Sequence, residues 1–300
     1  MKPLVLLRKA SAVIGEDGLQ LGSLAAEFQA LFPEQSPKYI DPLSLLAGIL
    51  AGRIFRRDEN PPPTAPDDAV ILGTAFGALE SSLEFDHQAL LKGPNTVNPM
   101  DFPNTVANAA GSRIGIWLQL KGPNVTLTNG GTSFIDALGF AWEGMNGGLF
   151  SRCLVGAVEK SPDFLKPAVV AGNPHVTLKA GAFLLLGAVE GEGFLQVEDY
   201  FSTQWKTDGT LHPIYQELLK GIFTGVEWLG LPFGSPIEKI VPQGIVRFSP
   251  EPSVLELGLG GKSSLESFLD SSHRAGVLGA VSFEERRISL VRIKRGKRSE

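Results

Sequence analysis

The stretch NVTLTNGGTSFIDALGFAWEGM, residues 124–145, decides the fold. Its first five residues are mostly β-branched or short and polar, and they predict a strand. Asn129-Gly130-Gly131 predicts a tight turn, and the apolar residues after it recur at helical spacing. A helix N-terminus next to a turn stabilises an anion through its free N–H groups and its dipole. Chemistry is therefore expected at this turn, although Gly130 and Gly131 carry no side chain.

Helix-type and strand-type segments alternate on both sides of this stretch. Their order predicts a layered α/β protein. The predicted helices are Asp41–Phe55 and Thr105–Leu120, and the predicted strands are Val70–Gly73, Arg152–Val158, Gly181–Glu190 and Phe194–Asp199, with a final hairpin of Val277–Phe283 and Ile288–Ile293.

Composition limits the classes of function. The 300 residues are 43% hydrophobic, which is enough for a large core in one domain or in two closely packed halves. The net charge of −5 gives no electrostatic reason to expect a nucleic-acid partner. The single cysteine, Cys153, excludes an internal disulfide and a cysteine metal cluster. No apolar run is long enough for membrane insertion or a signal peptide. We therefore expect a cytoplasmic protein without a metal or cofactor.

The segment from Phe102 to Glu159 resembles the β-ketoacyl synthase family. It contains FPNT-x-x-N, LKGP, a strand, the turn and helix quoted above, and a strand ending in Glu159, in the order typical of that family. ILGTAFGALESSLEF (Ile71–Phe85) is similar to the family's first strand and following loop, and LKAGAFLLLGAVEGE (Leu178–Glu192) to a later strand. Several spaced motifs in the right order are far more specific than one short pattern.

The resemblance implies a thiolase-like αβαβα fold built from two pseudo-equivalent halves. Residues 1–200 would form the N-terminal half and residues 201–300 a shortened C-terminal half. In the family, the strand before the turn pairs across a dimer axis, and the loop near Met100–Phe102 reaches the partner's acyl tunnel. The apolar face of the helix after the turn would then need cover from a partner. The implied tunnel or interface candidates are Met100, Phe102, Asn124, Thr126, Thr128 and Phe134.

The departures from the family pattern concern the catalytic residues. Condensing members use one cysteine and two histidines. Gly131 stands at the position of the cysteine, and Gln243 stands where the first histidine is expected. His273 keeps the spacing of the second histidine, but a strand pair follows it in place of a long helix. No intact catalytic residue is therefore expected.

A chain with glycine at the nucleophile position resembles the chain-length-factor class. Its members are silent subunits that pair with an active ketosynthase and act with an acyl carrier protein. A homodimer is a second possible assembly. One alternative is an acyl-thioester hydrolase, transferase or decarboxylase with a nucleophile other than cysteine. Another is a self-associating scaffold that keeps the fold alone.

Three further residues and one segment have competing interpretations. Cys153 lies in an apolar strand and is expected to be inert. Thr132 and Ser133 are expected to cap the helix, with cryptic nucleophiles as the alternative. Arg286–Arg298 holds seven basic residues. It is expected to be a solvated tail, with a docking patch for an acidic partner such as the carrier protein as the alternative.

Overall fold

A computed structural model describes residues 2–14, 21–56, 63–65, 67–160, 162, 180–189, 193–207, 209–231, 237, 241–248, 262–282 and 286–296. Its ten strands form one hydrogen-bonded sheet in the order β3-β2-β4-β5-β1-β6-β10-β9-β7-β8. The strands are β1 (Leu4–Ile14), β2 (Ala69–Gly73), β3 (Asn124–Leu127), β4 (Arg152–Lys160), β5 (Ala180–Ala188), β6 (Leu195–Gln204), β7 (Trp228–Gly230), β8 (Val246–Phe248), β9 (Ala275–Ser282) and β10 (Arg287–Arg295). The helices are α1 (Leu21–Leu31), α2 (Pro42–Arg56), α3 (Leu79–Lys92), α4 (Ala109–Leu118), α5 (Ser133–Asn146), α7 (Pro213–Ile222) and α8 (Lys262–Asp270), with 3-10 turns η1 (Pro94–Thr96), η2 (Pro99–Asn104) and η3 (Gly130–Thr132).

The strand order repeats. In the first half, β2 lies between β3 and β4 and is parallel to both, while β5 is antiparallel to β4 and β1. In the second half, β7 lies between β8 and β9 and is parallel to both, while β10 is antiparallel to β9 and β6. The same pairing pattern therefore occurs twice, from β1 to β5 and from β6 to β10. A division at residue 200 would fall inside β6, and we propose that the halves divide between β5 and β6.

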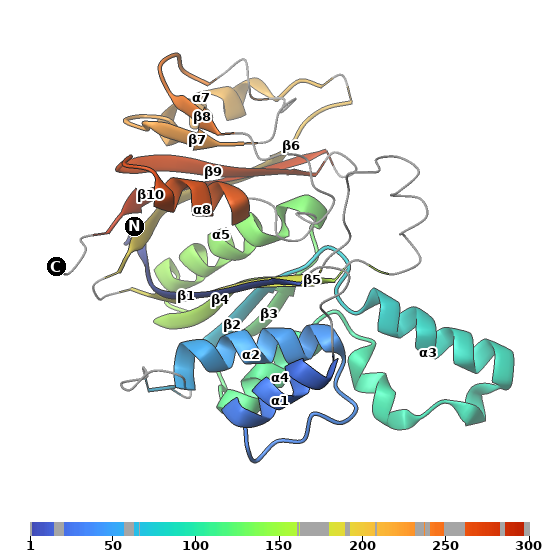
Figure 1. Cartoon of the computed structure of the whole chain (residues 1–300). Helices are drawn as coiled ribbons and strands as arrows, with labels where there is room; N and C mark the ends of the chain where they lie inside the picture. Colours follow the sequence, from blue (N-terminus) through green and yellow to red (C-terminus); the bar gives the residue numbers. More distant parts are fainter. Residues whose placement is uncertain are drawn as a thin grey trace.

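The layers follow from this repeat (Figure 1). The two half-sheets lie one above the other, and among the described strands they are joined where Leu4–Leu6 of β1 pairs with Leu195–Val197 of β6. α5 lies between them and contacts strands of both halves. α2 covers the outer face of the first half-sheet and α7 that of the second. The expected αβαβα layering is present.

The central strands are buried on both faces. In β4, Cys153 and Val155 point to the cluster around α5, whereas Leu154 and Val158 point to the cluster around α2. Alternation sends successive side chains to opposite faces, so a strand between two helix layers must be apolar throughout. This explains the unbroken run CLVGAV in β4.

Three local expectations need correction. The helix expected from Thr105 begins at Ala109, because η2 occupies residues up to Asn104. The N-terminal apolar segment forms β1, an interior strand that the sequence analysis did not predict. Most of the basic segment is not a solvated tail, since Arg287–Arg295 forms β10 between β6 and β9. Its last residues lie outside the described part of the chain.

Candidate functional site

The turn between β3 and α5 has the geometry that the sequence predicts. β3 ends at Leu127, Gly130 adopts the left-handed backbone with φ 54°, and α5 begins at Ser133. Gly73 ends β2 directly behind this turn. A Cβ atom added at residue 73 would lie 2.3 Å from the Ser133 carbonyl oxygen. Backbone packing this close fixes the turn at the carboxyl ends of β2 and β3, which is where α/β sheets commonly place ligand sites.

Both hydroxyl groups after the turn are fully buried and engaged in hydrogen bonds. The Thr132 hydroxyl lies 2.9 Å from the Asn129 carbonyl oxygen and 2.8 Å from the Asp136 carboxylate. The Ser133 hydroxyl accepts from the Asn129 N–H at 3.0 Å and lies 2.9 Å from the Thr74 carbonyl oxygen. The expected capping role is wrong in detail for Thr132, since its side chain contacts Asp136 and accepts no helix N–H. Neither hydroxyl is presented to solvent as a nucleophile.

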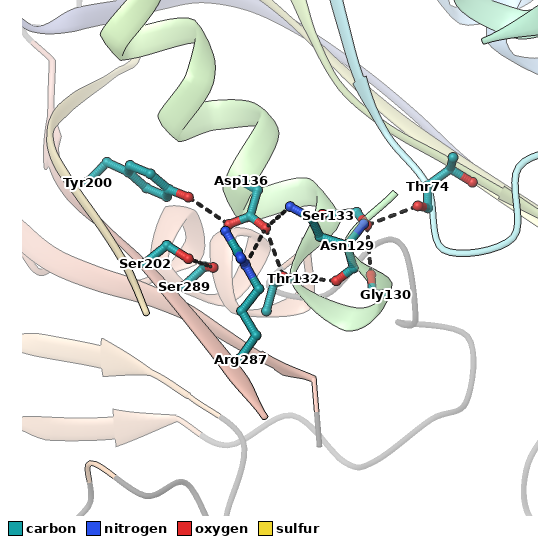
Figure 2. A network of polar contacts seen from close by, with 10 residues as sticks. All are labelled: Thr74, Asn129, Gly130, Thr132, Ser133, Asp136, Tyr200, Ser202, Arg287 and Ser289. Atoms are coloured by element: carbon teal, nitrogen blue, oxygen red, sulfur yellow. Dashed lines mark hydrogen bonds and ion pairs between the residues drawn. The ribbon is translucent and has the colours of Figure 1, made fainter. Parts of the chain in front are cut away.

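Asp136 is the centre of a buried polar network (Figure 2). Its carboxylate accepts hydrogen bonds from Asn129 at 2.7 Å, from the Tyr200 hydroxyl at 2.7 Å and from Arg287 at 3.2 Å. Burial, followed by the nearby Asp136 charge, raises the pKa of Tyr200. A buried charge with this many donors is well compensated. The network joins α5 to β6 and β10, and so joins the two halves.

The role of Asp136 as the centre of this network was not predicted from the sequence. Asp136 is one acidic residue among Phe134, Ile135, Ala137 and Leu138 on the buried part of α5. A carboxylate surrounded by core residues in a helix requires a buried partner, and that was the available signal. The partners on β6 and β10 lie 64 and 151 residues away, so only the tertiary fold identifies them.

Glu159 is a second buried carboxylate near the turn. It ends the interior part of β4 and is fully buried. It accepts hydrogen bonds from the Ala75 N–H at 2.5 Å, the Phe76 N–H at 3.3 Å and the Thr74 hydroxyl at 3.3 Å. Burial raises its pKa to about 7, and the hydrogen bonds lower it in part. Glu159 therefore holds the loop after β2, whose Thr74 carbonyl in turn contacts Ser133.

The structure does not bring Gln243 and His273 to the turn. β7, β8 and β9 are parallel, and Val246 and Gly276 both pair with Trp228. Gln243 and His273 each precede those residues by three positions, so both lie at the amino ends of these strands. The carboxyl end of β9 is the end near Asp136, because Ser282 pairs with Arg287. With about 3.3 Å per residue, the two ends of β9 lie about 20 Å apart.

The assignment of Gln243 and His273 as vestigial catalytic residues is therefore wrong in position. Most of the segment after β7 (residues 232–236 and 238–240) and residues 249–261 after β8 lie outside the described residues, and their sequence alone is considered. Residues 213–272 contain no histidine.

The interface candidates fall into two groups. Met100 and Phe102 are 58% and 59% exposed on η2, and the Phe102 ring lies 6.0 Å from that of Phe85 on α3. Asn124 and Thr128 are exposed at β3 and just after it, and Thr126 is half-buried in β3.

Phe134 does not belong with these interface candidates. It is fully buried against Phe183, with ring centroids 5.6 Å apart. Leu138 and Trp142 on the same helix are also buried by this chain, so the expectation that their face needs a partner is wrong.

The remaining features are the single cysteine, possible metal sites and possible membrane-spanning helices. Cys153 is fully buried, and burial raises the pKa of its thiol, as an inert core cysteine requires. In the described part of the chain, no group of three or more His, Cys, Asp or Glu side chains is arranged to hold a metal ion. Among the described helices, none has the length and apolar character needed to cross a membrane.

Comparison with known sequences agrees with this architecture. The family described as "Beta-ketoacyl synthase, N-terminal domain" matches residues 7–171, more than half of the chain. The chain is 32% identical over 93 residues to 3-oxoacyl-[acyl-carrier-protein] synthase 2 of Vibrio cholerae, an alignment that covers 31% of this chain and 22% of that protein. The enzyme of the same name from Vibrio harveyi is 30% identical over 93 residues, with the same coverage. The chain thus matches about a fifth of the length of these curated relatives.

Comparison with solved structures extends the likeness to the second half. The ishigamide ketosynthase/chain length factor superposes with a TM-score of 0.75 at 19% identity, over 98% of this chain and 99% of that one. A ketosynthase structure with the acyl carrier protein of a type II polyketide synthase gives a TM-score of 0.72 at 11% identity, over 98% and 99% of the two chains. At these identities the likeness establishes the thiolase-type ketosynthase fold. The matched family and the repeated β1–β5 and β6–β10 topology together show that this chain belongs to the β-ketoacyl synthase family.

Proposed function

We propose that this protein is a non-catalytic subunit of the chain-length-factor type, which pairs with a cysteine-bearing ketosynthase in fatty-acid-like or polyketide-like synthesis. The observation that carries the proposal is the intact turn without a nucleophile. The backbone at Gly130 and the start of α5 are formed, while Gly131 has no side chain. The absence of histidine from residues 213–272 removes the imidazoles that the condensing reaction requires.

Enzymatic alternatives that use another nucleophile receive less support. Thr132 and Ser133 are fully buried, and their hydroxyls are engaged by Asp136 and by backbone carbonyl groups. A nucleophilic hydroxyl needs an adjacent base and access to the substrate. Asp136 is adjacent to Thr132, but it already accepts from Asn129, Tyr200 and Arg287.

Two features support pairing with another subunit. β3 is a terminal strand of the ten-stranded sheet, so one of its edges has no neighbouring strand within the described chain. α3 projects from the layered body beside η2 (Figure 1) and has no buried residue. Leu90 and Leu91 are 84% and 72% exposed there, close in sequence to the exposed Met100 and Phe102. Exposed apolar side chains and an open strand edge are each typical of a protein interface.

The pairing register specifies which residue tests the open edge. The Val70 N–H bonds to the Pro123 carbonyl and the Thr74 N–H to the Leu127 carbonyl. In a parallel ladder of this register, the N–H groups of Val125 and Leu127 face β2, and that of Thr126 faces outward. Thr126→Pro therefore removes an outward donor, while Val125→Pro removes a donor inside the sheet.

The experiment is co-expression with the cysteine-bearing ketosynthases of the source organism, followed by size-exclusion chromatography with light scattering. We expect a one-to-one complex that Thr126→Pro and Leu90→Asp weaken without unfolding the chain. Leu149→Asp, at a leucine 63% exposed outside α3 and η2, is the matched control and should leave the complex intact. Val125→Pro should unfold or aggregate the protein.

Intact-mass measurement after incubation with an acyl thioester tests the silent role. We expect no adduct on this chain and an adduct on the partner's cysteine. A stable acyl group on Thr132, Ser133 or Cys153 would instead favour the alternative enzyme. A chain that self-associates and ignores every ketosynthase offered would favour the scaffold. The acyl carrier protein is proposed as a partner of the pair, by analogy with the carrier-protein complex described above.

A further inference from the structure

A groove of about 870 Å³ opens where the two half-sheets separate. β1 pairs with β6 only over Leu4–Leu6 and then continues along β5, while β6 continues along β10. The groove lies in the resulting wedge, lined by Lys9 of β1, by the end of β10 and by the segment between α8 and β9.

The lining is strongly basic. Lys9, Arg274, Lys294 and Arg295 line the groove against one carboxylate, that of Asp270. Lys9 and Arg274 are exposed, and the described part of the chain shows no ion pair for either side chain. Lys294 is half exposed and forms a long ion pair with Glu198 at 3.9 Å, which solvent screens because the Lys294 side chain is 55% exposed. The overall charge of the protein is −5, so this concentration of positive charge opposes the global balance.

Arg295 gives the groove a fixed wall. Its guanidinium donates to the Phe268 carbonyl at 2.6 Å, the Leu269 carbonyl at 2.9 Å and the His273 carbonyl at 2.8 Å, and it also contacts the Ser271 carbonyl. These bonds cap the carboxyl end of α8, so Arg295 has a structural role. The cations that remain to contact a ligand are Lys9 and Arg274, together with Lys294, whose ammonium is shared with Glu198; they come from three separate segments.

The groove also has an apolar part. Phe194 and Leu269 lie in its lining, so polar and apolar surfaces occur together. Its volume falls within the range of about 300–1,000 Å³ that is typical of pockets for small organic ligands. A phosphate alone would use only the cations, and an apolar molecule alone would leave them without counter-charge. The lining therefore fits a small molecule that has both an anionic and an apolar part.

We propose that this groove binds a soluble organic diphosphate, with Lys9, Arg274 and Lys294 at the phosphates and Phe194 and Leu269 against the organic group. The site is separate from the proposed pairing surface. Arg274 lies just before the amino end of β9, about 20 Å from the end that meets the turn. Lys9 lies on β1, four strands away from the open edge at β3. Binding here is a further function, and it does not depend on whether the chain is catalytically silent.

Isothermal titration calorimetry of the full chain with ADP, adenosine and inorganic pyrophosphate tests the proposal. We expect saturable one-to-one binding of ADP, at least fivefold tighter than that of adenosine or pyrophosphate. Raising the salt from 50 to 300 mM should weaken ADP binding severalfold. Arg274→Glu and Lys294→Glu should each weaken it at least tenfold. Lys220→Glu, an equal charge change on the exposed face of α7, should change it less than twofold.

Three results would overturn the proposal. The first is no saturable ADP binding, and the second is equal affinity for pyrophosphate and ADP. The third is equal weakening by Lys220→Glu, which indicates a non-specific charge effect. If Arg274→Glu instead abolishes binding of an acidic carrier protein while ADP does not bind, the groove is a protein-docking surface. Complex formation with the ketosynthase should be unchanged in Arg274→Glu, so failure of this proposal is distinguishable from failure of the pairing proposal.

Discussion

Replacing Glu159 by glutamine tests the buried carboxylate behind the turn. Burial raises the pKa of Glu159 from its ordinary value of 4.5 to about 7. The folded state then binds the proton more tightly than the unfolded state, so protonation of this group favours folding. Its contribution to stability is present at low pH and is lost as the pH rises through about 7. With these two pKa values, the free energy of unfolding falls by about 2–3 kcal/mol between pH 5 and pH 8 because of this group alone.

The glutamine variant should lose this pH dependence. It should also be less stable at pH 5, because the glutamine side chain has one acceptor oxygen and an NH₂ group where Glu159 offers two oxygens to Ala75, Phe76 and Thr74. A buried donor without an acceptor costs about 1–3 kcal/mol.

The assay is urea unfolding followed by tryptophan fluorescence at pH 5, 6, 7 and 8. Wild type should lose about 2–3 kcal/mol more than the Glu159→Gln variant across this range. Glu143→Gln, at an exposed position of α5, is the control and should keep the wild-type slope. Equal slopes for wild type and Glu159→Gln would show that this carboxylate does not titrate in that range, and the reasoning from burial would be refuted.

Two further predictions concern α5. Gly139→Ala should destabilise the protein by about 1–3 kcal/mol in thermal or urea unfolding, because the added Cβ atom would lie 2.3 Å from the Tyr200 ring. This loss should exceed the gain from the better helix propensity of alanine. An unchanged or raised unfolding midpoint would mean that the Tyr200 ring moves aside without cost. Gly131→Cys should give a thiol of lowered pKa at the helix start, and iodoacetamide should label it faster than the buried Cys153. Condensing activity should stay absent. Equal labelling of the two cysteines would show that residue 131 does not lie at the helix N-terminus.

Sequence patterns predicted most of the first half of the fold, although not β1, and in the second half they predicted β6, β9 and β10 but not β7 and β8. Periodicity predicted α2, β2, β4 and the β3–α5 unit with nearly the observed bounds, because a strand or helix buried against a core must show its period. β7 and β8 have three residues each, too few to show one. The exposed Gln243 was aligned by local spacing alone, and that spacing does not reveal at which end of a parallel strand a residue lies.

That residue 131 offers no side chain for chemistry follows from the amino-acid sequence alone. Gly131 has no side chain in any fold, and no histidine occurs between residues 213 and 272. The side chains that surround the turn are known only from the tertiary structure. Asp136, Tyr200 and Arg287 meet because α5 lies between two half-sheets, and their separations of 64 and 151 residues leave no local pattern. In the same way, Lys9 and Arg274 line one groove only because β1 and β6 part after three paired residues. Local interactions set periodicity and turns, whereas the pairing of distant strands sets which charges share a site.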